Sequence, residues 1–242
     1  MLNYLKKTRL KYFLKAIKLD VVVSFIRWKI IFINKVAITV EKDLLLLPPL
    51  ENSQKHIDVK LVEITPASIS QEAENQQALV YSNDKRHENR RQKAAYYLKK
   101  GYRGFALVRG NEVCGDIWYI GARIDRQGPL HPDMKWLGIR CGVNEAYAFD
   151  MYLYPEQRGN NMATWLQNGA LHEMRTVGFT KVFGYYWVKN IPALWAHRML
   201  RCKELKRIKL SRFFFIYFHV DKVIDKTSDD FGAKGYGFSF TR

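Results

Sequence analysis

The 242-residue sequence lacks the features that identify most metalloproteins, nucleotide-triphosphate enzymes and membrane-spanning proteins. Its three cysteines, Cys114, Cys141 and Cys202, do not have zinc-site spacing, and an odd number cannot all pair within one chain. The sequence has no P-loop and no glycine-rich dinucleotide fingerprint. No stretch approaches the roughly 18 uncharged residues of a spanning helix. We therefore expect reduced thiols in a cytoplasmic protein, no metal and no bound nucleotide triphosphate.

Acidic residues are also scarce, because 23 Asp and Glu face 40 Lys and Arg, which gives a formal net charge of +17. A field of that sign attracts nucleic acid, anionic lipid, acidic carrier proteins and phosphorylated cofactors. The sequence has no helix-turn-helix or RNA-reading motif, so nucleic acid is not an expected partner. The hydrophobic fraction of 48% is that of a globular protein, and the length suits one domain with an extension.

The first 50 residues differ from the rest of the chain. Leu10, Phe13, Leu14 and Ile17 have the i, i+3, i+4, i+7 spacing of an apolar helix face. The remaining surface of that helix is cationic, through Lys6, Lys7, Arg9, Lys11, Lys15 and Lys18. This pattern fits a helix packed on the domain, a peripheral contact with an anionic membrane surface, or a dock for a partner protein.

The remaining pattern predicts an α/β (α+β) domain over residues 51–220, after a basic amphipathic extension over 1–50 and a linker at Pro48 and Pro49. A tail rich in glycine and aromatic residues follows over 221–242. Strands are expected at 57–65, 105–109, 113–120, 146–154, 180–188, 205–210 and 212–220. Helices are expected at 66–81, at 84–100, after residue 161 and after residue 190.

The stretch from Asp150 to Ala163 contains the clearest functional signal. Pro155 ends an apolar and aromatic strand, because proline has no N–H for a sheet ladder. A short polar turn follows, and then Met162, Ala163 and later apolar residues recur at helical spacing. The first N–H groups of such a helix are free and carry the positive end of its dipole, which makes an anion site suited to a pyrophosphate.

These residues resemble the acyl-CoA loop of the GNAT superfamily of N-acyltransferases, which reads Gln/Arg-x-x-Gly-x-Gly/Ala. Arg158 matches its first position and Ala163 its last, and Asn161 stands where the family has glycine. Asn is among the best substitutes for glycine in the left-handed conformation. Downstream, Asn190 and Ala193 match the family's Asn-x-x-Ala, but His197 replaces its tyrosine and Arg201-Cys202 replaces its Gly-Phe.

The resemblance implies a mixed, mostly antiparallel central sheet flanked by helices, and an acetyl-CoA or longer acyl-CoA donor. It assigns pantetheine contacts to backbone groups at the strand end near Leu153 and Tyr154, and it makes Asn190 a further cofactor-binding residue. It assigns the pyrophosphate to the turn that starts the helix, namely Arg158, Gly159, Asn160, Asn161, Met162 and Ala163.

The resemblance also suggests two catalytic groups. Asp150 is the expected general base, and Glu145 is a reserve candidate; a carboxylate in an apolar strand needs partners or has a raised pKa. His197 would protonate the departing thiolate. The structural alternatives are a carboxylate that fixes a neighbouring loop and a histidine packed within its helix.

The connection over residues 126–144 is long for neighbouring strands and includes His131 and Trp136. Long loops on a rigid scaffold tend to carry specificity, so it is a candidate lid that binds the acceptor with these two residues. A surface insertion is the alternative.

Three functions fit these observations. The first is an N-acyltransferase that uses a CoA thioester and acts on an amino sugar, an amino acid or a lipid-linked amine, with contact to a membrane surface. The second uses an acyl carrier protein as donor, recruited by the positive charge. The third is an inactive module that binds anionic lipid or nucleic acid.

Overall fold

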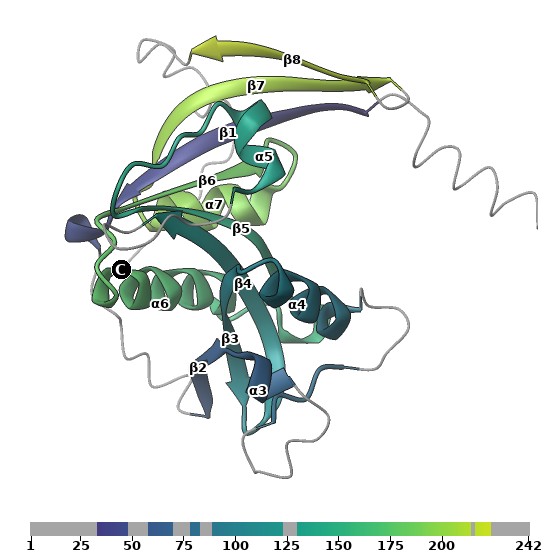
Figure 1. Ribbon diagram of the computed structural model, residues 1–242, viewed down its shortest axis with the longest axis vertical. Helices are drawn as coiled ribbons and strands as arrows, with labels where there is room; N and C mark the ends of the chain where they lie inside the picture. Colours follow the sequence, from purple (N-terminus) through teal and green to yellow (C-terminus); the bar gives the residue numbers. More distant parts are fainter. Residues whose placement is uncertain are drawn as a thin grey trace, which may run out of the picture.

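The computed structural model describes residues 33–47, 58–69, 78–82, 89–122, 130–213 and 216–223. Within this part, eight strands form one sheet in the order β2-β3-β4-β5-β6-β1-β7-β8 (Figure 1). The strands are β1 (Ile33–Asp43), β2 (Val59–Ile64), β3 (Arg103–Arg109), β4 (Glu112–Ala122), β5 (Glu145–Leu153), β6 (Lys181–Trp187), β7 (Lys203–Phe213) and β8 (Ile216–Val223). Every neighbouring pair is antiparallel except β5 and β6.

Helices cover both faces of the sheet. One face carries α6 (Met162–Thr176) and α7 (Ile191–Met199), and the other carries α4 (Arg90–Lys99) and α5 (Pro132–Leu137). Short helical turns are η1 (Leu44–Leu46), α3 (Pro66–Ile69) and η3 (Pro155–Gln157). None of the described helices is long and apolar enough to cross a membrane. The expected fold class, a mostly antiparallel sheet between helices, is confirmed.

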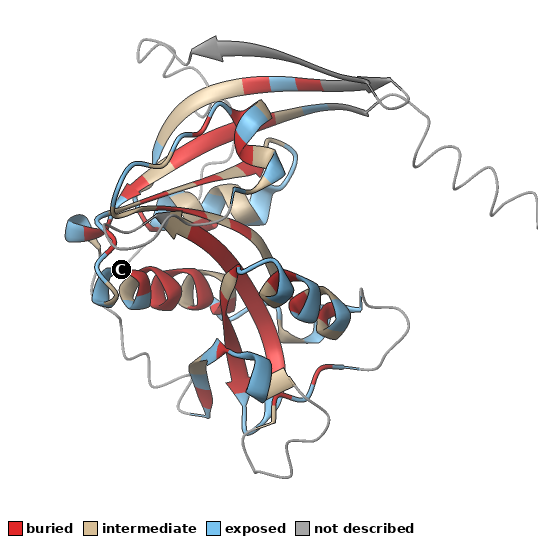
Figure 2. Ribbon diagram, viewed as in Figure 1, coloured by how far each residue is buried: buried red, intermediate tan, exposed pale blue. Residues whose placement is uncertain are grey.

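The helix α6 follows from its sequence pattern. Met162, Leu166, Ala170 and Met174 recur every four residues, and all four side chains are buried against the sheet. Figure 2 shows the middle of α6 in red, because residues 166–171 are all buried, while the exposed residues of the helix lie toward its C-terminal end. The burial fixes α6 over the sheet, so its first turn lies at the carboxyl end of β5.

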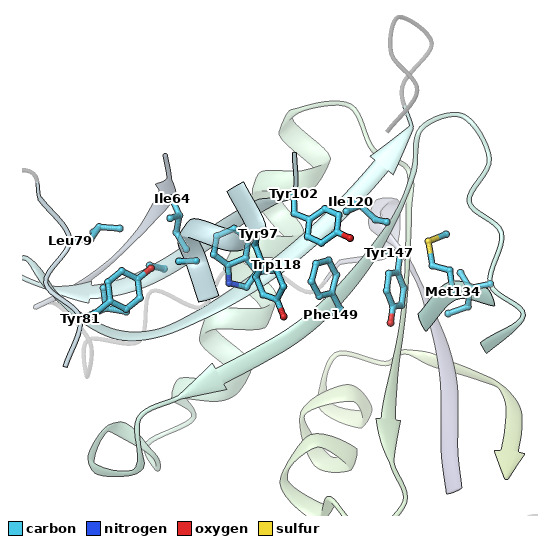
Figure 3. Packing of buried hydrophobic residues seen from close by; sticks show 14 of the residues in the cluster. Ile64, Leu79, Tyr81, Tyr97, Tyr102, Trp118, Ile120, Met134, Tyr147 and Phe149 are labelled. Carbon is cyan, nitrogen blue, oxygen red and sulfur yellow. The ribbon is translucent and has the colours of Figure 1, made fainter. Parts of the chain in front are cut away.

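The opposite face has a core of aromatic side chains. Tyr97 of α4 packs edge-on against Trp118 of β4 and Phe149 of β5, with ring centroids 5.1 and 5.4 Å apart (Figure 3). Tyr102 packs edge-on against Phe149 at 5.3 Å. This packing fixes α4 above the middle of β5, next to the point where β5 stops pairing with β6.

The strands β5 and β6 pair only briefly. In the described chain their parallel ladder contains Glu145–Lys181, Ala146–Val182 and Tyr147–Phe183, and no pair follows. β5 also has a bulge against β4, because Asp116 pairs with Tyr152 while Trp118 pairs with Phe149. The extra residue is accommodated at Asp150, whose φ is 48°. The bulge bends β5 at the point where it leaves β6.

The expected extension over residues 1–50 is wrong for residues 33–43, which belong to the central sheet. Ile33–Asp43 form β1, an interior strand between β6 and β7. Both faces of this strand are covered, so Ala37, Ile38, Thr39 and Val40 are all buried and show no period of two. In the sequence this run therefore looked like a continuation of the basic, apolar segment. Residues 1–32 lie outside the described part.

Two other expected elements differ. The helix expected over 66–81 is described as helix only at Pro66–Ile69, while Val80 forms a parallel bridge with Glu112. Residues 70–77 are outside the described part. The last strand continues to Val223, beyond the expected domain end at 220. The hairpin expected around Gly110-Asn111 is confirmed, with Gly110 at a φ of 59°.

Candidate functional site

A cavity of about 710 Å³ lies where β5 and β6 diverge. Residues 148–153 of β5 line one side and residues 182–187 of β6 line the other. Side chains from α6, α7 and β1 complete it on one face of the sheet. The cavity therefore begins where the β5–β6 ladder stops.

Each of the two strands presents a free edge to this cavity. β5 pairs with β4 along one edge up to Leu153, and β6 pairs with β1 from Lys181 to Trp187. In the described residues, the edges that face each other have no ladder partner beyond Tyr147 and Phe183. Free strand edges accept extended chains that contain amide groups, because their N–H and C=O groups have no other partner.

The first turn of α6 lies beside this opening. Gly159, Asn160 and Asn161 are three consecutive residues with positive φ, at 104°, 46° and 62°. Asn161 thus adopts the left-handed conformation expected of a residue in the family's glycine position. In the described structure the amides of Asn161 and Ala163 donate to no protein acceptor. The helix dipole adds positive potential, so this turn is suited to bind an anion.

Arg158 stands at the entrance to the turn. Its Nε donates to the carbonyl oxygen of Leu153 at 3.2 Å, and its guanidinium lies 6.0 Å from the ring of Tyr152. Its side chain is otherwise exposed. Arg158 therefore lies between the strand edge and the anion-binding turn, with donors left over for a phosphate.

Asp150 is held by three donors on one of its oxygens. Oδ2 accepts from Tyr97 Oη at 2.9 Å and from Arg90 Nη1 at 3.0 Å, and it pairs with Lys93 Nζ at 3.0 Å. Within the described chain Oδ1 accepts no hydrogen bond, and the side chain, 24% exposed, lines the cavity. The three donors therefore all bind Oδ2, and Oδ1 is the available acceptor of this side chain.

A second carboxylate lies behind the first. Arg90 and Asp116 are each 1% exposed and form a direct ion pair, and Arg90 Nε also donates to Asp116 Oδ2 at 3.3 Å. Burial raises the pKa of Asp116 to about 6, although the Arg90 charge opposes that shift. The guanidinium of Arg90 therefore joins β4 to β5 through two carboxylates. We infer that this buried pair holds the bulge at Asp150 in place.

His197 is on α7, across the cavity from Asp150. Gln167 of α6 lies 3.0 Å from its Nδ1, and its ring stacks on Tyr186. Burial lowers the pKa of His197 to about 4, so the imidazole is neutral at pH 7. The side-chain nitrogen of Gln167 can only donate, so this contact corresponds to the tautomer with its proton on Nε2. The ring then offers a hydrogen-bond donor rather than an acidic imidazolium.

The face opposite α6 and α7 carries an aromatic wall made of Trp136, Tyr185 and Trp187. The rings of Trp136 and Trp187 are stacked at 5.8 Å, and Tyr185 meets both edge-on. Tyr185 and Trp187 line the cavity, while Trp136 of α5 packs behind them. The segment predicted as a lid therefore supports this wall, with residues 123–129 outside the described part.

The structure brings seven of the predicted site residues to the cavity: Asp150, Leu153, Arg158, Gly159, Ala163, Asn190 and His197. Asn190 also caps α7, because its side chain accepts from Ala193 N at 3.3 Å. His131 and Trp136 do not line the cavity but contact Phe149 and Trp187, which do.

Tyr154 and Met162 are not brought to the cavity. Both side chains are buried elsewhere, and the Tyr154 N–H donates to the carbonyl oxygen of Cys114. The reserve candidate Glu145 lies at the closed end of the ladder, where it accepts from Gly142 N at 2.7 Å.

Among the cavity and support residues that were not anticipated from the sequence are Arg90, Asp116 and Lys42. Asp116 lies in an apolar strand between Gly115 and Ile117, and a buried carboxylate requires a cation. That signal could have singled out a buried arginine in the charged helix that follows residue 89. Lys42 gave no such signal, because the sequence placed it before the domain. Among the described residues no cluster of side chains could hold a metal ion.

A comparison with solved structures finds this fold in the GCN5-related glucosamine N-acetyltransferase region of a fungal multi-domain GH3 β-N-acetylglucosaminidase. The TM-score is 0.51 at 13% identity, over 82% of this chain and 22% of that one. The tandem GNAT protein from the clavulanic acid biosynthesis pathway matches with a TM-score of 0.44 at 14% identity, over 78% of this chain and 54% of that one.

The GCN5-related N-acetyltransferase from Sphaerobacter thermophilus also matches with a TM-score of 0.44 at 10% identity, over 84% of this chain and 57% of that one. No protein-family model and no curated protein matches the sequence. The resemblance noted in the sequence is thus confirmed at the level of the fold.

Proposed function

We propose that this chain, which has the fold of the GCN5-related N-acetyltransferases, is an N-acyltransferase that moves an acyl group from a coenzyme A thioester to an amine. One observation carries the proposal: in the described residues, two free strand edges face each other across a cavity beside a helix start whose Asn161 and Ala163 amides donate to no protein acceptor. The pantetheine arm contains two amides that pair with a strand edge, and a pyrophosphate fits free amides at a helix start.

The donor would lie along β5 with its pyrophosphate at the first turn of α6. Arg158 now donates to the carbonyl oxygen of Leu153. That oxygen belongs to the edge along which pantetheine would pair. Donor binding would therefore move the Arg158 side chain from Leu153 toward the pyrophosphate, where a charge-assisted pair is stronger.

Asp150 would receive the proton of the incoming ammonium group at Oδ1. The neutral amine then attacks the thioester carbonyl carbon, and the C–N bond forms as the C–S bond breaks. The second amine proton passes to the departing sulfur, which leaves as the free thiol of coenzyme A. A positioned carboxylate of this kind contributes on the order of 10²–10⁴ in rate.

His197 would assist the departure of sulfur as a neutral donor. With its Nδ1 occupied by Gln167, the Nε2–H is free to hydrogen-bond to the developing thiolate. Its pKa of about 4 makes an imidazolium scarce at pH 7, so this role differs from proton donation by a charged acid.

The acceptor would enter from the face opposite the donor, past Tyr185 and Trp187. Aromatic faces bind the C–H surfaces of sugars and rings and attract cations. An amine on a ring, such as an amino sugar, fits this wall better than a small aliphatic amine.

The test is isothermal titration with coenzyme A and with desulfo-CoA, followed by thiol-release assays with acetyl-CoA and a panel of amines. We expect binding of both ligands, and loss of affinity in Arg158→Ala. The exposed Arg198→Ala on α7 is a matched control. Absence of binding at millimolar coenzyme A would overturn the proposal.

A further inference from the structure

Lys42 is a buried cation at the far side of the cavity. It lies on β1 opposite Val182 of β6, lines the cavity and is 5% exposed. Its Nζ donates to the carbonyl oxygen of Leu46 at 2.7 Å. No carboxylate among the described residues forms an ion pair with it. A buried ammonium with only a neutral partner is costly, because charges inside proteins are normally paired.

The surrounding groups do not supply a counter-ion. Burial lowers the pKa of Lys42, and the Arg201 charge adds to that effect. Asp43 and Cys202 act in the opposite direction. However, Asp43 is exposed and its carboxylate accepts from Leu45 N at 2.9 Å, and burial raises the pKa of the Cys202 thiol to about 11, so that thiol is neutral. A bound anion would therefore be the strongest partner available to Lys42.

The cavity lining beside Lys42 is apolar. Val40, Val182, Ile117 and Leu171 line this part of the cavity. Leu171 is nine residues beyond the start of α6, which corresponds to about 14 Å along the helix axis. That distance is on the scale of an extended pantetheine arm. A donor anchored at the first turn of α6 would thus place its thioester near these residues, with its acyl group directed to Lys42.

We propose that Lys42 is a carboxylate-binding residue for the acyl group, and that the preferred donor is a short dicarboxylic acyl thioester. This rests on the proposed function, because it places the thioester in the same cavity. The methylene groups of the acyl chain contact Val40 and Val182, and the terminal carboxylate pairs with the Nζ of Lys42. The coenzyme A phosphates do not compete for this position, since they bind at the opposite end of α6.

The test compares two stable thioether analogues, S-carboxypropyl-CoA and S-butyl-CoA, by isothermal titration. Their chains match in length and differ in the terminal charge. A charge-assisted hydrogen bond predicts that the wild-type protein binds the carboxylate analogue at least about tenfold more tightly. In Lys42→Met this ratio is expected to fall close to one. The exposed Lys99→Met carries the same charge change and is expected to keep the wild-type ratio.

Each outcome has a distinct meaning. Equal affinities in the wild-type protein overturn the role of Lys42 but leave the transferase proposal intact. A ratio that survives in Lys42→Met shows that another residue binds the carboxylate. Failure of both analogues and of coenzyme A itself overturns the proposed function as well. Mass spectrometry after incubation with acetyl-CoA adds a further check: an acylated Lys42 would have no charge and would contradict the proposal.

Discussion

The β5–β6 pair has a closed half, where residues 145–147 and 181–183 form a ladder, and an open half beyond it, where the strands line the cavity. The two halves differ in burial and in backbone geometry. In the closed half, Ala146 and Tyr147 are fully buried and the ladder is regular. In the open half, β5 has a left-handed residue at Asp150, and its edge faces a cavity. The same two strands therefore serve first as a core and then as a binding slot. The change occurs within two residues, between Ala148 and Asp150.

This difference shows that the open half keeps its shape through contacts with side chains outside the sheet. A positive φ at a residue other than glycine costs of order 1 kcal/mol and persists only when the surroundings hold it. Here Arg90, Lys93 and Tyr97 of α4 hold Asp150 from outside the sheet. The closed half needs no such support, because ordinary packing stabilises it.

The largest effect should come from removing the buried support. Arg90→Met leaves Asp116 as an uncompensated buried carboxylate and should lower the free energy of unfolding by about 3–5 kcal/mol. Urea unfolding measures the change. The double variant Arg90→Met/Asp116→Leu removes both charges and should recover most of the loss. If the single variant is as stable as the exposed control Arg140→Met, the pair does not support the open half.

Next, Asp150→Asn should slow the chemical step while leaving the fold of the open half intact. The amide keeps the shape of the carboxylate but cannot receive a proton, so kcat for acyl transfer should fall by about 10²–10⁴. Thiol release measures kcat, and titration should show little change in affinity for coenzyme A. A fall in donor affinity with kcat unchanged would instead assign Asp150 to binding.

A smaller effect is expected from the pH dependence of His197. Its pKa is about 4 in the folded protein and near 6.5 when unfolded, so the unfolded state binds more protons between these values. The contribution of the neutral His197 ring to the free energy of unfolding has its full value above pH 6.5. It falls by about 1–3 kcal/mol as the pH drops toward 4. The difference in urea-unfolding free energy between wild type and His197→Gln, measured from pH 7 to 4, isolates this contribution. A difference independent of pH would contradict the burial of the ring.

The smallest effect compares two asparagines with nearly the same backbone. Asn161 in the open half has a φ of 62°, and Asn144 before the closed half has a φ of 61°. Replacing either by Ala should cost about 1 kcal/mol of stability. Only Asn161→Ala should also weaken coenzyme A binding, and Asn161→Gly should retain it. Equal effects of both alanine variants on coenzyme A binding would show that the turn at Asn161 is not part of the donor site.

The sequence predicted the parts of the site that depend on local chain geometry. Pro155, the polar turn and the apolar spacing after Asn161 are sufficient to place a strand, an anion-binding turn and a helix. The same holds for the hairpin at Gly110, whose turn signal is local.

The parts that were missed depend on distant partners. Arg90 was missed, because nothing near it in the chain reveals Asp116, 26 residues away. β1 and Lys42 were assigned to an extension, since their neighbours β6 and β7 follow only after residue 180. Long-range pairing of this kind has no signature within a window of sequence.

The interior position of β1 has a consequence for biosynthesis. Its last residue, Asp43, must wait for Lys181, the first residue of β6, before either of its two edges can pair. At typical translation rates of roughly 5–20 residues per second, that delay is on the order of seven to thirty seconds. During this time a nascent segment rich in valine and isoleucine leaves the ribosome with both hydrogen-bonding edges open. The yield of the folded protein in the cell should therefore depend on holdase chaperones, although both edges of β1 are paired in the finished sheet.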